Sequence, residues 1–255
     1  SRSVPRKKRI SANRSEAEVI PPAELNALQN EAYTRVKELF NFHGVVLLHG
    51  VTSSGKTEIY IHLIREQLAM GRQVLYMLPE IALTTQIIER LQKHFGATIG
   101  VYHSRLTPAA RQDVWRRAGN GSLGAVLGVR SSLFLPFKDL GLIIVDEEHD
   151  SSYKQYDPAP RYHARDAAMM LSRIHGGMTL LGSATPSVES YHNATSGRYG
   201  LVELTARYGD VKMPAMIVAD TRSHGKKKKA ASHFTPRMLD AVGEALAKSE
   251  QVILF

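Results

Sequence analysis

Residues 50–57 read Gly-Val-Thr-Ser-Ser-Gly-Lys-Thr and match the phosphate-binding pattern G-x-x-x-x-G-K-[ST] without a mismatch. In such a loop the glycines let the backbone curl, so that successive N–H groups and the start of a helix point at a phosphate. Lys56 then reaches the β- and γ-phosphates, and the hydroxyl of Thr57 holds Mg²⁺. An apolar run at 45–48 precedes the loop and a helix-like segment at 58–70 follows it, which is the order that a nucleoside triphosphate site requires.

Most residues of this loop are predicted to contact the nucleotide. The alternative is a glycine-rich turn that happens to carry a lysine, but such a turn does not require a strand before it and a helix after it. The predicted contact residues are Gly50, Thr52, Ser53, Ser54, Gly55, Lys56 and Thr57.

A triphosphate loop also needs a carboxylate at the end of a neighbouring strand, and the stretch Leu-Ile-Ile-Val-Asp-Glu at 142–147 provides one. Asp146 is the predicted Mg²⁺ ligand, directly or through water. Glu147 is the predicted general base, which orients and deprotonates the attacking water. The alternative is a solvated acidic turn over residues 146–150, and the four apolar residues directly before it argue against that interpretation.

Outward from these two stretches, apolar runs of strand length alternate with segments of helical periodicity. Because the runs are apolar throughout, the pattern is typical of an α/β fold whose mainly parallel sheet carries helices on both faces. The predicted strands lie at 45–48, 74–78, 98–102, 124–129, 142–145 and 178–181, and the predicted helices at 24–40, 58–70, 83–95, 108–118, 164–174 and 187–196.

The two ends of the chain differ from this central part. Residues 1–23 lack apolar periodicity and end in Ile-Pro-Pro, which predicts a linker or tail. Residues 24–205 are predicted to form one domain. Because the sequence stops within an apolar run, we expect residues 206–255 to be a linker and the beginning of a second domain, cut from a longer protein. The elements predicted there are a strand at 216–218, a low-complexity loop at 223–232, a helix at 236–248 and a strand at 251–255.

The formal net charge of +9 comes from two short segments. Residues 1–14 carry six Lys or Arg and residues 222–229 carry five, with no Asp or Glu in either segment. Subtracting these 11 from the 33 basic residues leaves 22 against 24 acidic residues, a balance of −2. Basic blocks of this kind are either solvated linkers or arms that bind nucleic acid, so charge alone leaves DNA binding open.

Composition excludes several classes of protein. The chain has no cysteine, so it holds no disulfide and no thiolate metal site, which suits a reducing cytoplasm. Its apolar runs are no longer than strands and its N-terminal stretch is basic, so we expect neither a membrane span nor a secretory signal, and a cytoplasmic location. A GTPase would carry a guanine-reading N-K-x-D sequence, and the chain has none.

Two further motifs carry a resemblance to a known family. The stretch Asp-Glu-Glu-His at 146–149 resembles the D-E-x-H box of superfamily 2 helicases, and Gly-Ser-Ala-Thr at 182–185 resembles their S-A-T motif. Ser53 departs from the family, which usually has glycine there, but the generic pattern leaves that position free. Further stretches resemble one bacterial branch, the replication-restart DNA helicases; they lie at 50–52, 78–84, 102–104, 128–131, 146–155 and 161–166.

The resemblance implies a RecA-like P-loop NTPase domain, the first lobe of an ATP-dependent 3′–5′ DNA helicase with ATP and Mg²⁺ as cofactors. Such helicases act at stalled forks in replication restart and primosome assembly. The implied partners are therefore forked or single-stranded DNA, primosome proteins and single-strand-binding proteins. Zinc is implied for the full-length protein, in a cysteine-rich region that is not in this chain.

The resemblance also implies that this chain alone hydrolyses ATP slowly. In the family, the arginine that stabilises transition-state charge comes from the second lobe, so we expect this chain alone to be weak or inactive as a motor. The alternative is a module that binds nucleotide and DNA without motor activity.

The remaining site residues are carried over from the resemblance. Gln29 resembles the family's adenine-reading glutamine; the alternative is an exposed polar residue on a helix. Thr84, Arg130 and Ser131 resemble residues that grip the DNA backbone, and the alternative is ordinary helix capping.

An aromatic and basic segment follows the acidic box. It resembles a loop that senses DNA, and its rings and cations are suited to stacking bases. The alternative is a packed surface loop around two prolines, Pro158 and Pro160. The residues predicted to bind or sense DNA in this loop are Tyr153, Lys154, Tyr156, Arg161 and Tyr162. Ser183 and Thr185 resemble the residues that couple hydrolysis to strand movement.

Overall fold

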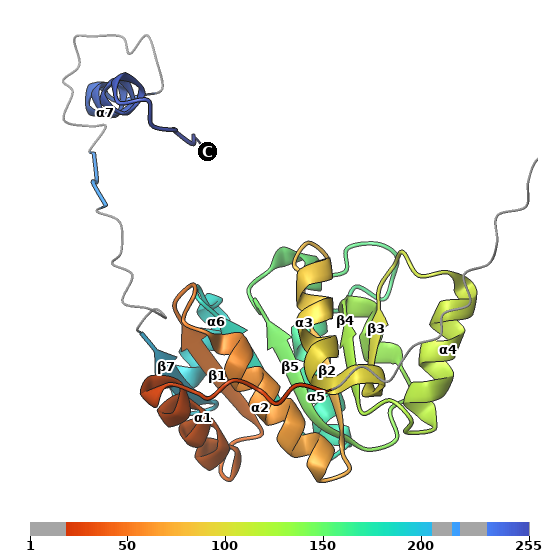
Figure 1. Ribbon diagram of the computed structural model, residues 1–255. Helices are drawn as coiled ribbons and strands as arrows, with labels where there is room; N and C mark the ends of the chain where they lie inside the picture. Colours follow the sequence, from red (N-terminus) through yellow and green to blue (C-terminus); the bar gives the residue numbers. More distant parts are fainter. Residues whose placement is uncertain (1–18, 206–215, 220–233, 255) are drawn as a thin grey trace, which may run out of the picture. The chain divides into compact units, whose positions relative to one another are not determined.

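The computed structural model describes residues 19–205, 216–219 and 234–254 (Figure 1). The chain divides into two compact units, residues 1–211 and 212–255. The two basic segments, 1–14 and 222–229, lie outside the described residues. The predicted boundary between the domains, after residue 205, stays a prediction, because residues 206–215 also lie outside the described residues.

The larger unit is built on a seven-stranded sheet with the order β3-β4-β2-β5-β6-β1-β7. Every pair of neighbouring strands is parallel, which confirms the predicted α/β sheet. Parallel order brings the carboxyl ends of all strands to one edge, where ligands bind in folds of this class. The strands are β1 (Val45–Gly50), β2 (Gln73–Met77), β3 (Ile99–Tyr102), β4 (Ala125–Gly128), β5 (Leu140–Asp146), β6 (Met178–Ser183) and β7 (Gly200–Leu204).

Helices cover both faces of this sheet (Figure 1). Successive strand residues alternate between two buried clusters, so that Ile144 packs toward α1, α2 and α3 while Ile143 packs toward α4, α5 and α6. The helices are α1 (Ala27–Phe40), α2 (Lys56–Ala69), α3 (Thr85–Phe95), α4 (Pro108–Gly119), α5 (Ala164–Ile174) and α6 (Val188–Thr195), with 3₁₀ turns η1 (Gly96–Thr98), η2 (Arg130–Phe134) and η3 (Ser151–Tyr153). In the described part of the chain, no helix combines the length and the apolar composition that crossing a bilayer requires.

The sequence predictions fail mainly near the C-terminus. The pattern missed β7, a five-residue edge strand that pairs with β1. The strands predicted at 216–218 and 251–255 are wrong, because residues 216–219 and 251–254 adopt no strand conformation. A strand needs a neighbour to satisfy its backbone N–H and C=O groups, and an apolar run alone does not supply one. The smaller unit contains the helix α7 (Pro236–Ala247), as predicted.

Replacing Ile144 by alanine tests the role of the central strand. Ile144 is fully buried, so Ile144→Ala is expected to lower the free energy of unfolding by about 2–5 kcal/mol. Ile174→Ala is the matched control, because Ile174 lies on α5 with 73% of its surface exposed and is expected to cost less than about 0.5 kcal/mol. Urea denaturation measures both, and equal losses would contradict the assigned core.

Candidate active site

Three of the predicted motifs meet at the carboxyl edge of the sheet. The loop at 50–57 follows β1, the acidic box begins at the end of β5, and Ser183 ends β6, which lies between β1 and β5. The register places Gly182 beside both Leu48 and Asp146. A cavity of about 500 Å³ lies at this edge. Its lining residues are Ala23, Glu24, Gln29, Thr52, Ser53, Ser54, Gly55, Lys56, Thr57, Glu58, Arg90, Asp146 and Glu147.

The loop itself has the backbone of a phosphate cradle. Gly55 is the N-cap of α2 with φ 84°, and no side chain caps the helix, so the first N–H groups of α2 are left for a ligand. Lys56 Nζ donates to Gly50 O at 2.7 Å, and Ser54 Oγ is buried without a hydrogen-bond partner. Position 53 has φ 63°, a left-handed conformation that glycine adopts without strain. These features fit a bound triphosphate.

Gln29 joins α1 to this loop. Its side chain completes a capping box with Asn26, because Asn26 N donates to Gln29 Oε1 at 3.0 Å and Gln29 N donates to Asn26 Oδ1 at 2.9 Å. Gln29 Nε2 donates to Ser54 O at 3.3 Å. A side chain at position 55 would collide with Gln29, because a Cβ added to Gly55 would lie 2.1 Å from this nitrogen. Gln29 is only 2% exposed, so the alternative of an exposed helix residue is wrong. Adenine reading stays a prediction.

Asp146 is a buried carboxylate with three hydrogen-bond donors. Tyr60 donates to Oδ1 at 3.0 Å, Tyr76 donates to Oδ2 at 3.1 Å, and the backbone N–H of Glu147 donates to Oδ1 at 3.1 Å. Burial raises the pKa of Asp146 to about 6, and the charge of Glu147 adds to this, while the tyrosine hydrogen bonds and Lys56 oppose it. Neither tyrosine is among the site residues predicted from the sequence, although the position of Tyr60 one turn after Lys56 is a signal that it lies near the cradle.

Glu147 lies where water can reach it. Its φ of 48° turns the backbone away from the β5 direction, and its side chain is 39% exposed and lines the cavity. Glu147 Oε2 lies 3.7 Å from His149 Nδ1. This placement is compatible with a general base beside a triphosphate, a role that stays a prediction.

His149 links the acidic box to the S-A-T motif. Its Nδ1 lies 2.8 Å from Ser183 Oγ, and its Nε2 lies 3.4 Å from Thr185 Oγ1. Ser183 is fully buried, and its hydroxyl also accepts from Thr185 N at 3.0 Å. A change at the box therefore has a direct path of hydrogen bonds to the predicted coupling residues.

Glu148 is a second buried carboxylate that sequence reasoning did not single out. Arg165 Nη1 on α5 donates to Glu148 Oε2 at 3.0 Å, and Ser187 N, the N-cap of α6, donates to Oε1 at 2.7 Å. The hydroxyls of Ser187 and Ser190 also donate to this carboxylate. Glu148 is fully buried, so these contacts fix α5 and α6 to the acidic box.

The residues predicted to grip the DNA backbone lie on loops at the same edge. Thr84 is the N-cap of α3 and accepts from Ile87 N at 3.5 Å, so the capping alternative describes what its side chain does. Arg130 Nη1 donates to the carbonyl oxygens of Ser152, at 3.2 Å, and Lys154, at 2.8 Å. Arg130 thus holds the aromatic segment in place, while Ser131 is exposed on η2.

The aromatic segment is partly core and partly surface. Tyr153 is 1% exposed and donates from its hydroxyl to Asp146 O at 2.7 Å. The prediction that Tyr153 stacks on bases is therefore wrong, because its ring is packed in the core. Tyr162 packs edge-on against Phe134, with 5.3 Å between ring centroids. Tyr156 is 69% exposed, and Lys154 Nζ donates to the carbonyl of the exposed Arg161.

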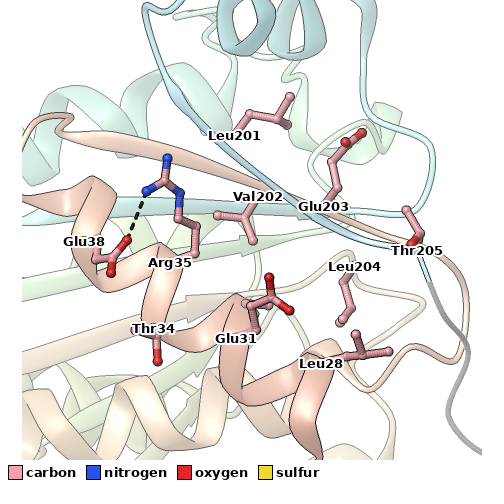
Figure 2. A pocket seen from close by; sticks show the side chains of 11 residues that line it. Leu28, Glu31, Thr34, Arg35, Glu38, Leu201, Val202, Glu203, Leu204 and Thr205 are labelled. Atoms are coloured by element: carbon pink, nitrogen blue, oxygen red, sulfur yellow. Dashed lines mark hydrogen bonds and ion pairs between the residues drawn. The ribbon is translucent and has the colours of Figure 1, made fainter.

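A larger cavity of about 640 Å³ lies between α1 and β7 (Figure 2). Its charged residues are the carboxylates Glu31, Glu38 and Glu203 and a single Arg35, which pairs with Glu38 at 3.0 Å. This acidic lining repels phosphates, so the cavity is not the nucleotide site despite its size.

Comparison with known proteins agrees with this geometry. The family described as DEAD/DEAH box helicase matches residues 25–194. The chain is 40% identical to replication restart protein PriA of Bacillus subtilis, over 92% of this chain and 29% of that protein. It is 43% identical to the PriA of Rickettsia conorii, over 91% and 35%. The chain thus spans only 29% to 35% of the length of these two relatives, and the resemblance to replication-restart helicases is confirmed.

Solved structures show the same fold. RecG bound to a three-way DNA junction matches with a TM-score of 0.51 and 25% identity, over 76% of this chain and 24% of that chain. The Hef helicase domain of Pyrococcus furiosus matches with a TM-score of 0.53 and 18% identity, over 73% and 39%. The RecA-like P-loop fold predicted for this chain is confirmed.

The raised pKa of Asp146 predicts a pH-dependent stability in metal-free buffer. Between the ordinary value of 3.8 and about 6 the folded protein binds this proton more tightly than the unfolded chain, so the free energy of unfolding falls as pH rises. The decrease in the free energy of unfolding caused by Asp146 approaches about 3 kcal/mol above pH 7. Asp146→Asn removes this dependence. Denaturation from pH 4 to pH 7 is expected to show the variant gaining stability relative to the wild type, and parallel profiles would contradict the assignment.

Proposed function

The chain belongs to the DEAD/DEAH box helicase family, and on that premise we propose that its larger unit is the Mg-ATP-binding lobe of a bacterial DNA helicase that acts in replication restart. One observation carries the proposal. The phosphate loop, the acidic box and the S-A-T motif meet at a single edge, and His149 lies 2.8 Å from Ser183 there. A site that only bound nucleotide would not need that third motif.

Most residues that line the cavity have a proposed part in binding or hydrolysing ATP. Lys56 and the N–H groups of 52–57 hold the phosphates, and Gln29 contacts the adenine. Thr57 and Asp146 hold Mg²⁺, which neutralises phosphate charge when bound. Glu147 orients and deprotonates the attacking water. The open N-terminus of α2 and the unpartnered Ser54 Oγ support this arrangement.

DNA is the proposed second ligand. The relatives are named for replication restart, and RecG in its solved structure is bound to a three-way DNA junction. In this chain the exposed Thr84, Ser131, Tyr156 and Arg161 are the proposed contacts, and Arg130 positions the aromatic segment that carries Tyr156 and Arg161. Forked or single-stranded DNA as substrate, 3′–5′ polarity, partners among primosome and single-strand-binding proteins, and a cytoplasmic location are proposed from the family.

We propose further that this chain hydrolyses ATP weakly by itself. Among the described residues, Arg90 is the arginine that lines the cavity, and it pairs with Glu58, so the transition-state arginine is proposed to come from the second lobe of the whole protein. Steady-state turnover with and without forked DNA tests this. Tight nucleotide binding with negligible turnover supports the proposal, whereas DNA-stimulated turnover at motor-like rates contradicts it.

Lys56→Ala tests the phosphate cradle. The variant loses the charge that faces the β- and γ-phosphates, so its affinity for a fluorescent Mg-ATP analogue is expected to fall at least about tenfold while the fold remains intact. Lys138→Ala, at an exposed position outside the cavity, is the control and should bind like the wild type. Unchanged affinity in Lys56→Ala would overturn the assignment of the site.

Tyr156→Ala tests base stacking by the aromatic segment. Loss of one stacked base costs about 1–3 kcal/mol, so affinity for single-stranded DNA, measured by fluorescence anisotropy, is expected to fall about 5- to 150-fold. Phe42→Ala is the control, because Phe42 is 82% exposed and lies before β1, at the opposite edge of the sheet. Equal affinities of the two variants would show that Tyr156 does not stack on DNA.

A further inference from the structure

Two tyrosines from different elements converge on the carboxylate of Asp146. Tyr60 lies on α2, four residues after Lys56, and Tyr76 lies on β2, which pairs with β5. Their rings are buried, 0% and 1% exposed, and stand edge-on with centroids 5.5 Å apart. The hydroxyls reach different oxygens, Tyr60 to Oδ1 and Tyr76 to Oδ2. We call this pair the tyrosine clamp.

The clamp also involves the strand of the S-A-T motif. A Cβ added to Gly182 on β6 would lie 1.8 Å from the hydroxyl oxygen of Tyr60 and 3.2 Å from Asp146 Oδ1. Only glycine therefore leaves room for the hydroxyl between α2 and β6. The hydroxyl of Tyr60 thus lies between the helix of the phosphate loop, the end of β5 and the end of β6.

The hydrogen bonds leave one oxygen of Asp146 with spare capacity. Each carboxylate oxygen offers two lone pairs. Oδ1 accepts from both Tyr60 and the N–H of Glu147, whereas Oδ2 accepts from Tyr76. The carboxylate is therefore fixed on both sides, and Oδ2 is the atom with a lone pair left for a ligand in the cavity that Asp146 lines.

We propose that Tyr60 and Tyr76 are positioning residues that hold Asp146 in the orientation that binds the divalent cation of the nucleotide. The inference rests on the proposed Mg-ATP site and adds two residues to it. A phenylalanine fills the same space in the core, so packing alone does not explain two hydroxyls directed at one carboxylate. Partners that orient a metal ligand in this way typically contribute 10- to 100-fold to metal affinity.

The test is a Mg²⁺ titration of nucleotide binding. The chain is mixed with a fluorescent ATP analogue in EDTA, and Mg²⁺ is added to the wild type, Tyr60→Phe and Tyr76→Phe. Each variant is expected to need about 10- to 100-fold more Mg²⁺ for its half-maximal effect, with unchanged nucleotide affinity in EDTA. Tyr33→Phe is the control, because its hydroxyl donates to Glu66, outside the cavity, and should leave the titration unchanged.

The outcomes separate this inference from the proposed function. If the wild type binds Mg-nucleotide and both folded variants titrate like it, the clamp has no such role. A parallel loss of affinity in EDTA would also contradict the inference, because it would show general damage to the cradle. If the wild type itself does not bind Mg-nucleotide, the proposed function fails instead. Thermal melts show whether each variant is folded. If Tyr60→Phe is unfolded, Tyr76→Phe still tests the inference, because it does not change a residue of α2.

Discussion

The site depends on one buried carboxylate and on the groups that keep it in place. Asp146 ends the central strand β5 and faces the phosphate loop, and it accepts from Tyr60, Tyr76 and the N–H of Glu147. Burying a carboxylate is costly unless hydrogen bonds replace its water. Those bonds come from α2, β2 and the acidic box, so the same contacts that join these elements also hold Asp146 beside the nucleotide cradle.

Two hydrogen-bond networks then extend from this centre. His149 contacts Ser183 and so joins the acidic box to β6. Glu148 binds Arg165 and the start of α6, which ties the same box to the far face of the sheet. A rearrangement at the acidic box would therefore reach β6, α5 and α6 through direct contacts, without passing through the apolar core.

The sequence predicts the fold well because its evidence is local. The phosphate loop, the apolar run before Asp146 and the helical spacing of 164–174 each depend on neighbours along the chain. The errors concern contacts between distant residues. The burial of Tyr153 and the convergence of Tyr60 and Tyr76 on Asp146 depend on contacts between residues far apart in the sequence, and β7 is a strand because β1 lies beside it. The run at 251–254 is equally apolar but has no such neighbour among the described residues.

The most direct measurement is a structure of this chain with Mg²⁺ and a non-hydrolysable ATP analogue. The account predicts phosphates on the N–H groups of residues 52–57, the cation between Thr57 and Asp146, and the adenine beside Gln29. Glu147 would face the γ-phosphate. A nucleotide bound elsewhere, for example in the cavity between α1 and β7, or a cation without Asp146 near it, would contradict the account.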